Sequence, residues 1–320
     1  MEDGQGVLEL RDIAVPTPGP QQVLVRIGAA SLNRGELIAG HGLHGSGSAA
    51  KPSGMEGAGE VVQCGAGVTG LQAGDRVMGR CAGAFAEYAL MEAREAMPMP
   101  ATLSLEEAAS VPLTFLVVYD MLVLQGHLKA DEWLLITGVS SGVGVAALQT
   151  AKALGAKVIG TSGSAEKLTR LKALGLDVGL CTRAPDFHPA VLQATDGKGV
   201  NLVVNNVGGS VFAECVRSMA FEGRLATVGY VDGVLKAEID IEALHARRLT
   251  LFGVSNKLRN PAQRAQSLPG FKADMLPLIA SGAIKPVIER VYPFDQLAAA
   301  KAMMEENRHL GKIVLAGAGG

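Results

Sequence analysis

The most chemically informative stretch of the chain is a glycine-rich turn that follows a short apolar segment at residues 133–137. Gly142 and Gly144 are followed by Ala147, and this Gly-x-Gly-x-x-Ala spacing is typical of a turn that binds a dinucleotide. Gly142 permits a tight turn, Gly144 allows close approach of a pyrophosphate to the backbone, and Ala147 allows close packing of the next helix. The free N–H groups of that helix would bind the pyrophosphate. We therefore expect dinucleotide contacts at Ser141, Gly142, Val143 and Gly144.

Ser162 bears on the type of dinucleotide. It lies about 20 positions after Gly142, where an NAD-binding turn places an acidic residue on the ribose 2′-OH. A carboxylate there would repel a 2′-phosphate. The small hydroxyl and glycine residues at 160–164 instead leave room for a phosphate and can bond to it. This favours NADPH as the cofactor.

The elements around this turn predict an α/β domain with a doubly wound parallel sheet. From about residue 117, short apolar strands alternate with helices of 10–15 residues, a pattern typical of a parallel sheet covered on both faces. Ser164 is a good N-cap, and Gly155 and Gly175 can end helices in a left-handed conformation. We expect helices at 142–154 and 165–174 and strands at 133–137, 157–161, 177–180, 200–205, 224–229 and 249–254.

The rest of the chain predicts a second, β-rich domain. Its expected strands lie at 7–11 and 22–27, on either side of a proline-rich turn at 16–20, and near 60–63, 75–78 and 85–90. We expect helices at 263–281 and 295–306 and a last strand at 312–315. The predicted domains are therefore 117–257 for the dinucleotide and 1–116 with 258–320 for the substrate.

Composition excludes several classes of function. The chain has 320 residues, 48% of them hydrophobic, and a net charge of −2, so no basic surface predicts nucleic-acid or anionic-membrane binding. Its apolar runs fall well short of the ~18 residues that cross a bilayer. The N-terminus does not resemble a signal peptide, and the four cysteines form no Cys-x-x-Cys pair. We therefore expect a cytoplasmic protein with reduced thiols.

Several further segments, taken together, resemble the medium-chain dehydrogenases/reductases of the zinc-free quinone oxidoreductase and enoyl reductase type. The resemblance covers nearly the whole chain, and its order and spacing are more specific than any single piece. It implies a Rossmann cofactor domain, a GroES-like catalytic domain, and hydride transfer to a small electrophilic substrate. The segments are Pro16-x-Pro-Gly-Pro20, Ala30-Ser-Leu-Asn33, Gly54-Met-Glu56-Gly-Ala-Gly59, Gly74-Asp75-Arg76-Val, Gly83-Ala-Phe-Ala-Glu87-Tyr, Val207-Gly208-Gly209 and His309-Leu-Gly311-Lys312-Ile-Val.

The resemblance also bears on metal binding and catalysis. Zinc-dependent relatives have Cys and His ligands where this chain has Asn33 and Met55, which are poor zinc ligands, so we expect no metal. Asn33 matches an asparagine near the nicotinamide ribose and substrate. His44 falls where relatives have a tyrosine that is a proposed proton donor, and imidazole can donate a proton near neutral pH. A proton taken from solvent is an equal alternative.

Other cofactor contacts follow from the same resemblance. Lys167 sits where NADPH-dependent relatives have a phosphate-binding lysine. A family tyrosine is replaced by Thr182, and the adjacent Arg183 can bind phosphate in its place. The remaining expected contacts, at strand ends and in the closing motif, are Asn206, Gly208, Gly229, Tyr230 and Lys312.

Two alternatives for function stay open at this level. The first is an NADPH-dependent reductase of quinones or activated C=C bonds. The second is a nucleotide-binding relative with a structural or partner-binding role and little turnover. It is favoured by the departures at His44 and Thr182 and by Val117, which stands where many relatives have a threonine. In either case the resemblance implies a homodimer that pairs the edge strand near residues 248–254.

Overall fold

The fold is taken from a computed structural model, which describes residues 9–37 and 52–317. The chain divides into two compact units, one formed by residues 1–116 with 256–320 and the other by residues 117–255. These limits lie close to the domain boundaries expected from the sequence. Each unit is described below by itself.

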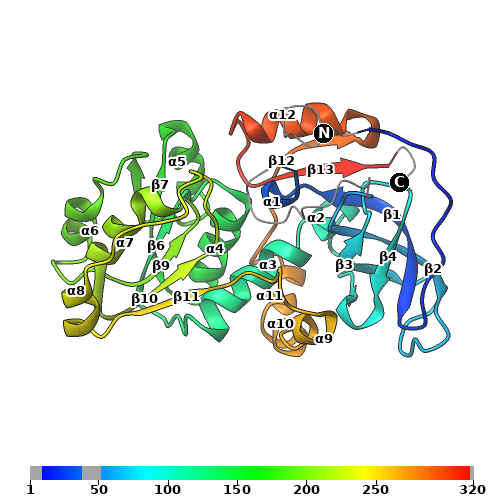
Figure 1. Ribbon diagram of the computed structural model, residues 1–320, viewed down its shortest axis with the longest axis horizontal. Coiled ribbons are helices and arrows are strands. Elements are labelled where there is room, and N and C mark those ends of the chain that lie inside the picture. Colours follow the sequence, from blue (N-terminus) through cyan, green and yellow to red (C-terminus); the bar gives the residue numbers. More distant parts are fainter. Residues whose placement is uncertain (1–8, 38–51, 318–320) are drawn as a thin grey trace. The chain divides into compact units, whose positions relative to one another are not determined.

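The second unit is a six-stranded, wholly parallel sheet in the order β11-β10-β9-β6-β7-β8, counted over the described residues (Figure 1). Helices connect successive strands, so this unit has the predicted doubly wound α/β fold. Its strands are β6 (Trp133–Thr137), β7 (Lys157–Ser162), β8 (Val178–Cys181), β9 (Val200–Asn205), β10 (Met219–Thr227) and β11 (Thr250–Gly253). Its helices are η2 (Asp120–Leu124), α4 (Gly142–Ala153), α5 (Ala165–Lys172), α6 (His188–Ala194), η3 (Gly209–Val211), α7 (Phe212–Ser218) and α8 (Ile241–Ala246).

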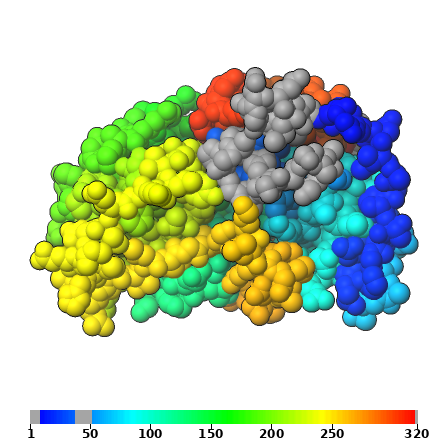
Figure 2. Space-filling view, in the orientation of Figure 1, coloured from blue at the N-terminus to red at the C-terminus, as the bar shows by residue number. Residues whose placement is uncertain are grey.

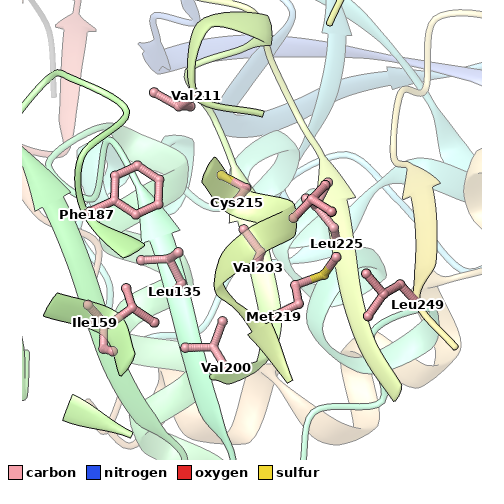
Figure 3. Close-up of a cluster of buried hydrophobic side chains, with 12 residues drawn as sticks. Leu135, Ile159, Phe187, Val200, Val203, Val211, Cys215, Met219, Leu225 and Leu249 are labelled. Carbon is pink, nitrogen blue, oxygen red and sulfur yellow. The ribbon is translucent and has the colours of Figure 1, made fainter. Parts of the chain in front are cut away.

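Aliphatic side chains from the strands and helices form the core of this unit (Figure 3). Leu135, Ile159 and Val203 come from three adjacent strands, and Cys215 on α7 packs against the same cluster. The expected helix ends are confirmed. Ser164 caps α5, while Gly155 and Gly175 have φ values of 80° and 92° after α4 and α5. Local sequence signals therefore fix where these helices start and stop.

The first unit contains a mainly antiparallel sheet that closes on itself. Within the described residues, seven strands follow the order β12-β13-β1-β2-β3-β4, with β5 beside β3 and an additional pairing of β1 with β4. The strands are β1 (Gln22–Ser31), β2 (Glu56–Cys64), β3 (Arg76–Ala82), β4 (Tyr88–Glu92), β5 (Met97–Pro98), β12 (Ile288–Pro293) and β13 (Lys312–Ala316). The C-terminal segment thus returns to this sheet, where β13 pairs with β1. This β-rich unit is the predicted GroES-like partner of the Rossmann unit.

The helices of this unit are short. They are α1 (Arg34–Leu37), η1 (Ala93–Glu95), α2 (Leu105–Ala109), α9 (Pro261–Ala265), α10 (Leu268–Asp274), α11 (Leu276–Ala280), η4 (Phe294–Gln296) and α12 (Leu297–Glu305). Helix α3 (Pro112–Tyr119) contains the first boundary between the units. Among the described residues, no helix combines the length and apolar character needed to cross a membrane.

Three expectations about elements were wrong. Glu9–Arg11 is not a strand: Leu10 is 66% exposed, and β1 already pairs with β2, β4 and β13. The predicted helix at 263–281 is three short helices, because Pro269 and Pro277 each lie in the first turn of a new one and cannot continue the hydrogen-bond ladder of the helix before it. The strand expected at 85–90 begins only at Tyr88. Val7 and Leu8 lie outside the described residues.

Candidate functional site

The glycine-rich turn connects β6 to α4. Ser141 is the N-cap of α4, and its Oγ accepts a hydrogen bond from the Gly144 N–H at 3.0 Å. A Cβ at Gly144 would lie 2.6 Å from the carbonyl oxygen of Val139, so glycine is required for the turn to pack against its own helix. The left-handed residue of the turn is Gly138, at φ 63°, and Gly142 is an ordinary first residue of α4. The tight turn expected at Gly142 therefore lies at Gly138.

The end of β7 brings together the residues expected to recognise the 2′ position. Ser162 is 6% exposed, its Oγ lies 3.4 Å from the Ser140 Oγ, and it accepts from the Ser164 N–H at 3.3 Å. Arg183 packs directly over Gly163, where any Cβ would collide with the guanidinium and its stem. Lys167 lies in the first turn of α5, and its N–H donates to Ser164 Oγ.

Thr182 has a role that sequence reasoning missed. Its hydroxyl donates to the Asp186 carboxylate at 2.7 Å and accepts from the Ala184 N–H at 3.0 Å. These bonds order the loop after β8 that carries Arg183. Threonine hydroxyls often accept a hydrogen bond from the backbone N–H two residues later, so Thr182 alone could have predicted a turn here.

The strand ends at 205–208 are tied together by side-chain amides. The Asn206 amide donates to the Thr137 carbonyl at 3.0 Å, and Asn205 Oδ1 accepts from the N–H groups of Val207 and Gly208. Gly208, at φ 128°, lies against the Asp232 carboxylate, where a side chain would clash. These bonds stabilise the fold of this unit. The expected contacts of Asn206 and Gly208 with the cofactor stay predictions.

Gly229 and Tyr230 follow β10 at the same edge of the sheet. A Cβ at Gly229 would lie 3.3 Å from the Asn206 carbonyl, and the Tyr230 carbonyl accepts from the Gly233 N–H at 2.9 Å. The Tyr230 side chain is half-buried. Both residues therefore shape the loop that follows β10.

In the other unit, Lys312 lies at the centre of a buried polar cluster. At the start of β13, its Nζ lies 2.9 Å from Glu56 Oε1, 2.9 Å from Asn33 Oδ1, 3.2 Å from Thr114 Oγ1 and 3.1 Å from the Leu32 carbonyl. Lys312 is 6% exposed and Glu56 is fully buried. We call Asn33, Glu56, Thr114 and Lys312 the lysine cluster.

Glu56 accepts more hydrogen bonds than its ion pair alone. The Asn33 amide donates to its Oε1 at 2.8 Å, as does the Ser31 hydroxyl at 3.0 Å, while the Leu113 N–H donates to Oε2 at 2.8 Å. A buried charge is tolerated when its lone pairs are satisfied in this way. Asn33 is consequently held at both ends of its amide, by Glu56 and by Lys312.

The donor set of this cluster does not suit zinc. The Asn33 amide donates to Glu56 and accepts from Lys312, and a lysine ammonium already supplies the positive charge. Ammonium and amide groups are not zinc ligands. Over the described ranges, no group of three His, Cys, Asp or Glu side chains could hold a metal ion. Burial raises the pKa of the Cys81 thiol, which makes it a poor source of thiolate.

Two further residues bear on the candidate site. His44, the expected proton donor, lies outside the described residues. Glu36 on α1 was not singled out from the sequence: burial raises its pKa to about 8, and both of its carboxyl oxygens are buried. No local pattern could have revealed this, because the groups around it come from distant strands.

Comparisons with known proteins agree with this architecture. Residues 19–101 match the family model for the alcohol dehydrogenase GroES-like domain, and residues 142–268 match that for zinc-binding dehydrogenases. A quinone oxidoreductase from Pseudomonas syringae pv. Tomato DC3000 is 32% identical, with a TM-score of 0.84, over 96% of this chain and 95% of that one. A quinone oxidoreductase from Escherichia coli, solved in complex with NADPH, is 29% identical, with a TM-score of 0.85, over 96% and 94% of the two chains.

A longer relative is also similar. Highly reducing polyketide synthase 40 from Fusarium pseudograminearum (strain CS3096) is 31% identical over 301 residues. The match covers 92% of this chain but spans only 12% of the synthase. From the two matched family models and the 32% identical structure, the chain belongs to the medium-chain dehydrogenase/reductase superfamily and is an oxidoreductase of that fold.

Proposed function

We propose that the protein is an NADPH-dependent reductase that works without zinc and reduces a quinone or an activated C=C bond of an enone or enoyl compound. The observation that carries the proposal is the end of β7. There a buried serine and a glycine covered by Arg183 stand where an acidic residue would select NAD.

The electrostatics of this strand end support a 2′-phosphate. Arg183 is exposed beside Gly163, and the N-terminal turn of α5 begins at Ser164. A planar guanidinium, hydroxyl groups and the first N–H groups of a helix all favour a phosphate dianion. We assign the 2′-phosphate to Ser162, Lys167 and Arg183. The pyrophosphate is assigned to Ser141, Gly142, Val143 and Gly144, and the rest of the cofactor to Asn206, Gly208, Gly229 and Tyr230.

The lysine cluster supports an electron-poor acceptor. When bound, a reduced nicotinamide supplies a hydride. Asn33 is held by Glu56 and Lys312 and is proposed to contact the substrate in a fixed orientation. Without a Lewis acid, an alcohol is not activated, whereas a quinone or enone already has a carbonyl oxygen that accepts the developing negative charge. This favours reduction of electron-poor acceptors.

The relatives support the same class of reaction. The two bacterial structures are called quinone oxidoreductases, and one of them was solved with NADPH. The protein is also proposed to act in the cytoplasm, which fits its four free cysteines.

A homodimer is proposed through β11. Among the described strands, β11 is the last of its sheet and pairs only with β10, so its other edge is open. An open edge with half-buried Leu251 and Phe252 is a place where a second chain can extend the sheet. The nearby segment at about 230–245, yellow in Figure 2, also exposes Val231, Val234, Leu235 and Ile241.

The test is consumption of NADPH with a panel of quinones and short enones, with analysis of the product. A saturated ketone formed in step with NADPH loss would identify C=C reduction, and a hydroquinone would identify quinone reduction. If NADPH binds and no acceptor is consumed, the protein is instead a nucleotide-binding relative with a structural or partner-binding role. Binding of NADH as tight as that of NADPH would contradict the cofactor assignment.

A further inference from the structure

Glu36, a buried acid beside the lysine cluster, has no role in the proposed function. Helix α1 starts directly after Asn33, and the Glu36 N–H donates to the Asn33 carbonyl at 3.1 Å. Both carboxyl oxygens of Glu36 are buried, and neither forms a hydrogen bond with any residue of the ranges 9–37 and 52–317 at ordinary distances. The Met55 backbone lies close enough to favour the charged form of the Glu36 carboxyl. Burial of an ionised carboxylate in this way is costly, so the neutral acid is favoured.

The charges around Glu36 come from three strands of the same unit. Glu56 on β2 disfavours its ionisation, while Lys312 on β13 and Arg80 on β3 favour it. The buried thiol of Cys81 also lies within electrostatic range. Desolvation outweighs the two cations, and the pKa of Glu36 rises from 4.5 to about 8. At neutral pH, Glu36 therefore keeps its proton.

We propose that Glu36 is a positioning residue whose neutral form keeps the Asn33–Lys312–Glu56 network closed and whose ionisation opens it. The proposal rests on the proposed reductase function, in which Asn33 orients the substrate. With Glu36 neutral, Lys312 is free to bind Asn33 Oδ1 and Glu56 Oε1 at 2.9 Å each. When Glu36 loses its proton to solvent, a second carboxylate competes for the ammonium and repels Glu56. The bonds that hold the Asn33 amide then weaken.

Glu36→Gln separates this role from that of a proton donor. Glutamine has the same shape as a protonated glutamate and cannot ionise. A positioning role predicts that kcat/KM of the parent protein falls above pH ~8, where Glu36 ionises. Glu36→Gln should keep kcat/KM within about twofold of the parent at pH ~6.5 and should not show this fall. Glu60→Gln is the control, because Glu60 is an exposed carboxylate paired with Arg26, and it should keep the alkaline fall.

Two kinetic results would overturn the proposal. A loss of kcat/KM of more than about tenfold at pH ~6.5 in Glu36→Gln would make Glu36 a proton donor. An unchanged alkaline fall in that variant would assign the titration to another group. If the parent protein reduces no acceptor, the proposed reductase function is wrong, and the role of Glu36 is decided by a measurement that needs no substrate.

A measurement without substrate decides the inference in that case. The free energy of unfolding that is lost in Asn33→Ala should be larger at pH ~6.5 than at pH ~9, because the hydrogen bonds of Asn33 with Glu56 and Lys312 are weakened once Glu36 ionises. In a Glu36→Gln background, the loss should be the same at both pH values. Equal losses in the two backgrounds at both pH values would overturn the proposal.

The parent protein alone offers a check if Glu36→Gln does not fold. An infrared band of a protonated buried carboxyl should be present near neutral pH and should disappear with a midpoint near the pKa of Glu36, about 8. A spectrum without such a band at pH ~7 would show that Glu36 is already ionised, which contradicts the proposal.

Discussion

The ammonium of Lys312 and the carboxylate of Glu56 form an ion pair of 2.9 Å in which both side chains are almost completely buried. They come from opposite ends of the sequence, on β13 and β2. Four acceptors surround the ammonium, and one of them is the amide oxygen of Asn33. The pair therefore links the C-terminal strand to the residue that we propose to orient the substrate.

Lys312→Met should be strongly destabilising. It leaves the Glu56 carboxylate buried without its counter-ion, which costs about 3–5 kcal/mol. Urea unfolding measures this loss, and adding Glu56→Gln should recover part of it. Lys301→Ala is a matched control, since it breaks a more exposed pair with Glu305 worth about 0.3–0.5 kcal/mol. A loss in Lys312→Met no larger than that of the control would contradict the buried-charge account.

Arg183→Ala should weaken NADPH binding by about 10- to 100-fold, the effect of losing one charge-assisted hydrogen bond to phosphate. NADH lacks the 2′-phosphate, so its affinity should change little. Titration of each nucleotide by fluorescence or calorimetry checks both statements. An equal loss for the two nucleotides would mean that Arg183 supports the loop and not the phosphate.

Ser162→Asp should shift the preference towards NADH. The carboxylate would repel a 2′-phosphate and could accept hydrogen bonds from the ribose hydroxyls. Lys167→Ala should weaken NADPH binding and leave NADH nearly unaffected. The same titrations apply, and a Ser162→Asp protein that still prefers NADPH by the parental ratio would contradict the assignment at the end of β7.

Gly144→Ala should destabilise the second unit by about 1–3 kcal/mol, the usual cost of forcing an extra methyl group into a packed site. The reason is the Cβ position, 2.6 Å from the Val139 carbonyl oxygen, which is backbone and cannot move aside. Gly19→Ala is the control, because its Cβ would meet only the flexible side chain of Gln22. Thermal unfolding of the two variants compares them, and equal melting temperatures would be evidence against this role.

Phe252→Glu should convert the proposed dimer into monomers. A charge on the open edge of β11 would oppose pairing with a second chain. Sedimentation velocity reports the oligomeric state. Phe221→Glu adds the same charge at a side chain that is 62% exposed on β10, and it should leave the assembly unchanged. A parent protein that is monomeric at all concentrations tested would rule out this interface.

Much of the second unit could be predicted from the sequence because its signals are local. The apolar run at 133–137, the glycine-rich turn and the helix-ending Gly155 each specify a backbone conformation within a few residues. The single helix predicted at 263–281 was wrong because of signals that are equally local, since Pro269 and Pro277 lie in the first turns of two new helices. The two prolines are enough to predict that division.

The lysine cluster could be predicted only in part. Asn33 and Lys312 were singled out by resemblance, but no pattern joined them to Glu56, Thr114 or Glu36. These residues meet because β13 pairs with β1 and because β2 lies on the other side of β1. Long-range strand pairing of this kind leaves no periodic trace in the sequence, so the charge balance of the cluster is visible only in the folded chain.

Whether the protein is an NADPH-dependent reductase is decided by incubating it with a short enone and either NADPH or NADH, and by measuring nucleotide oxidation and product together. We expect one saturated ketone for each NADPH oxidised, or a hydroquinone when a quinone replaces the enone, with much slower oxidation of NADH. Tight binding of NADPH without its consumption by any quinone or enone would contradict the reductase assignment.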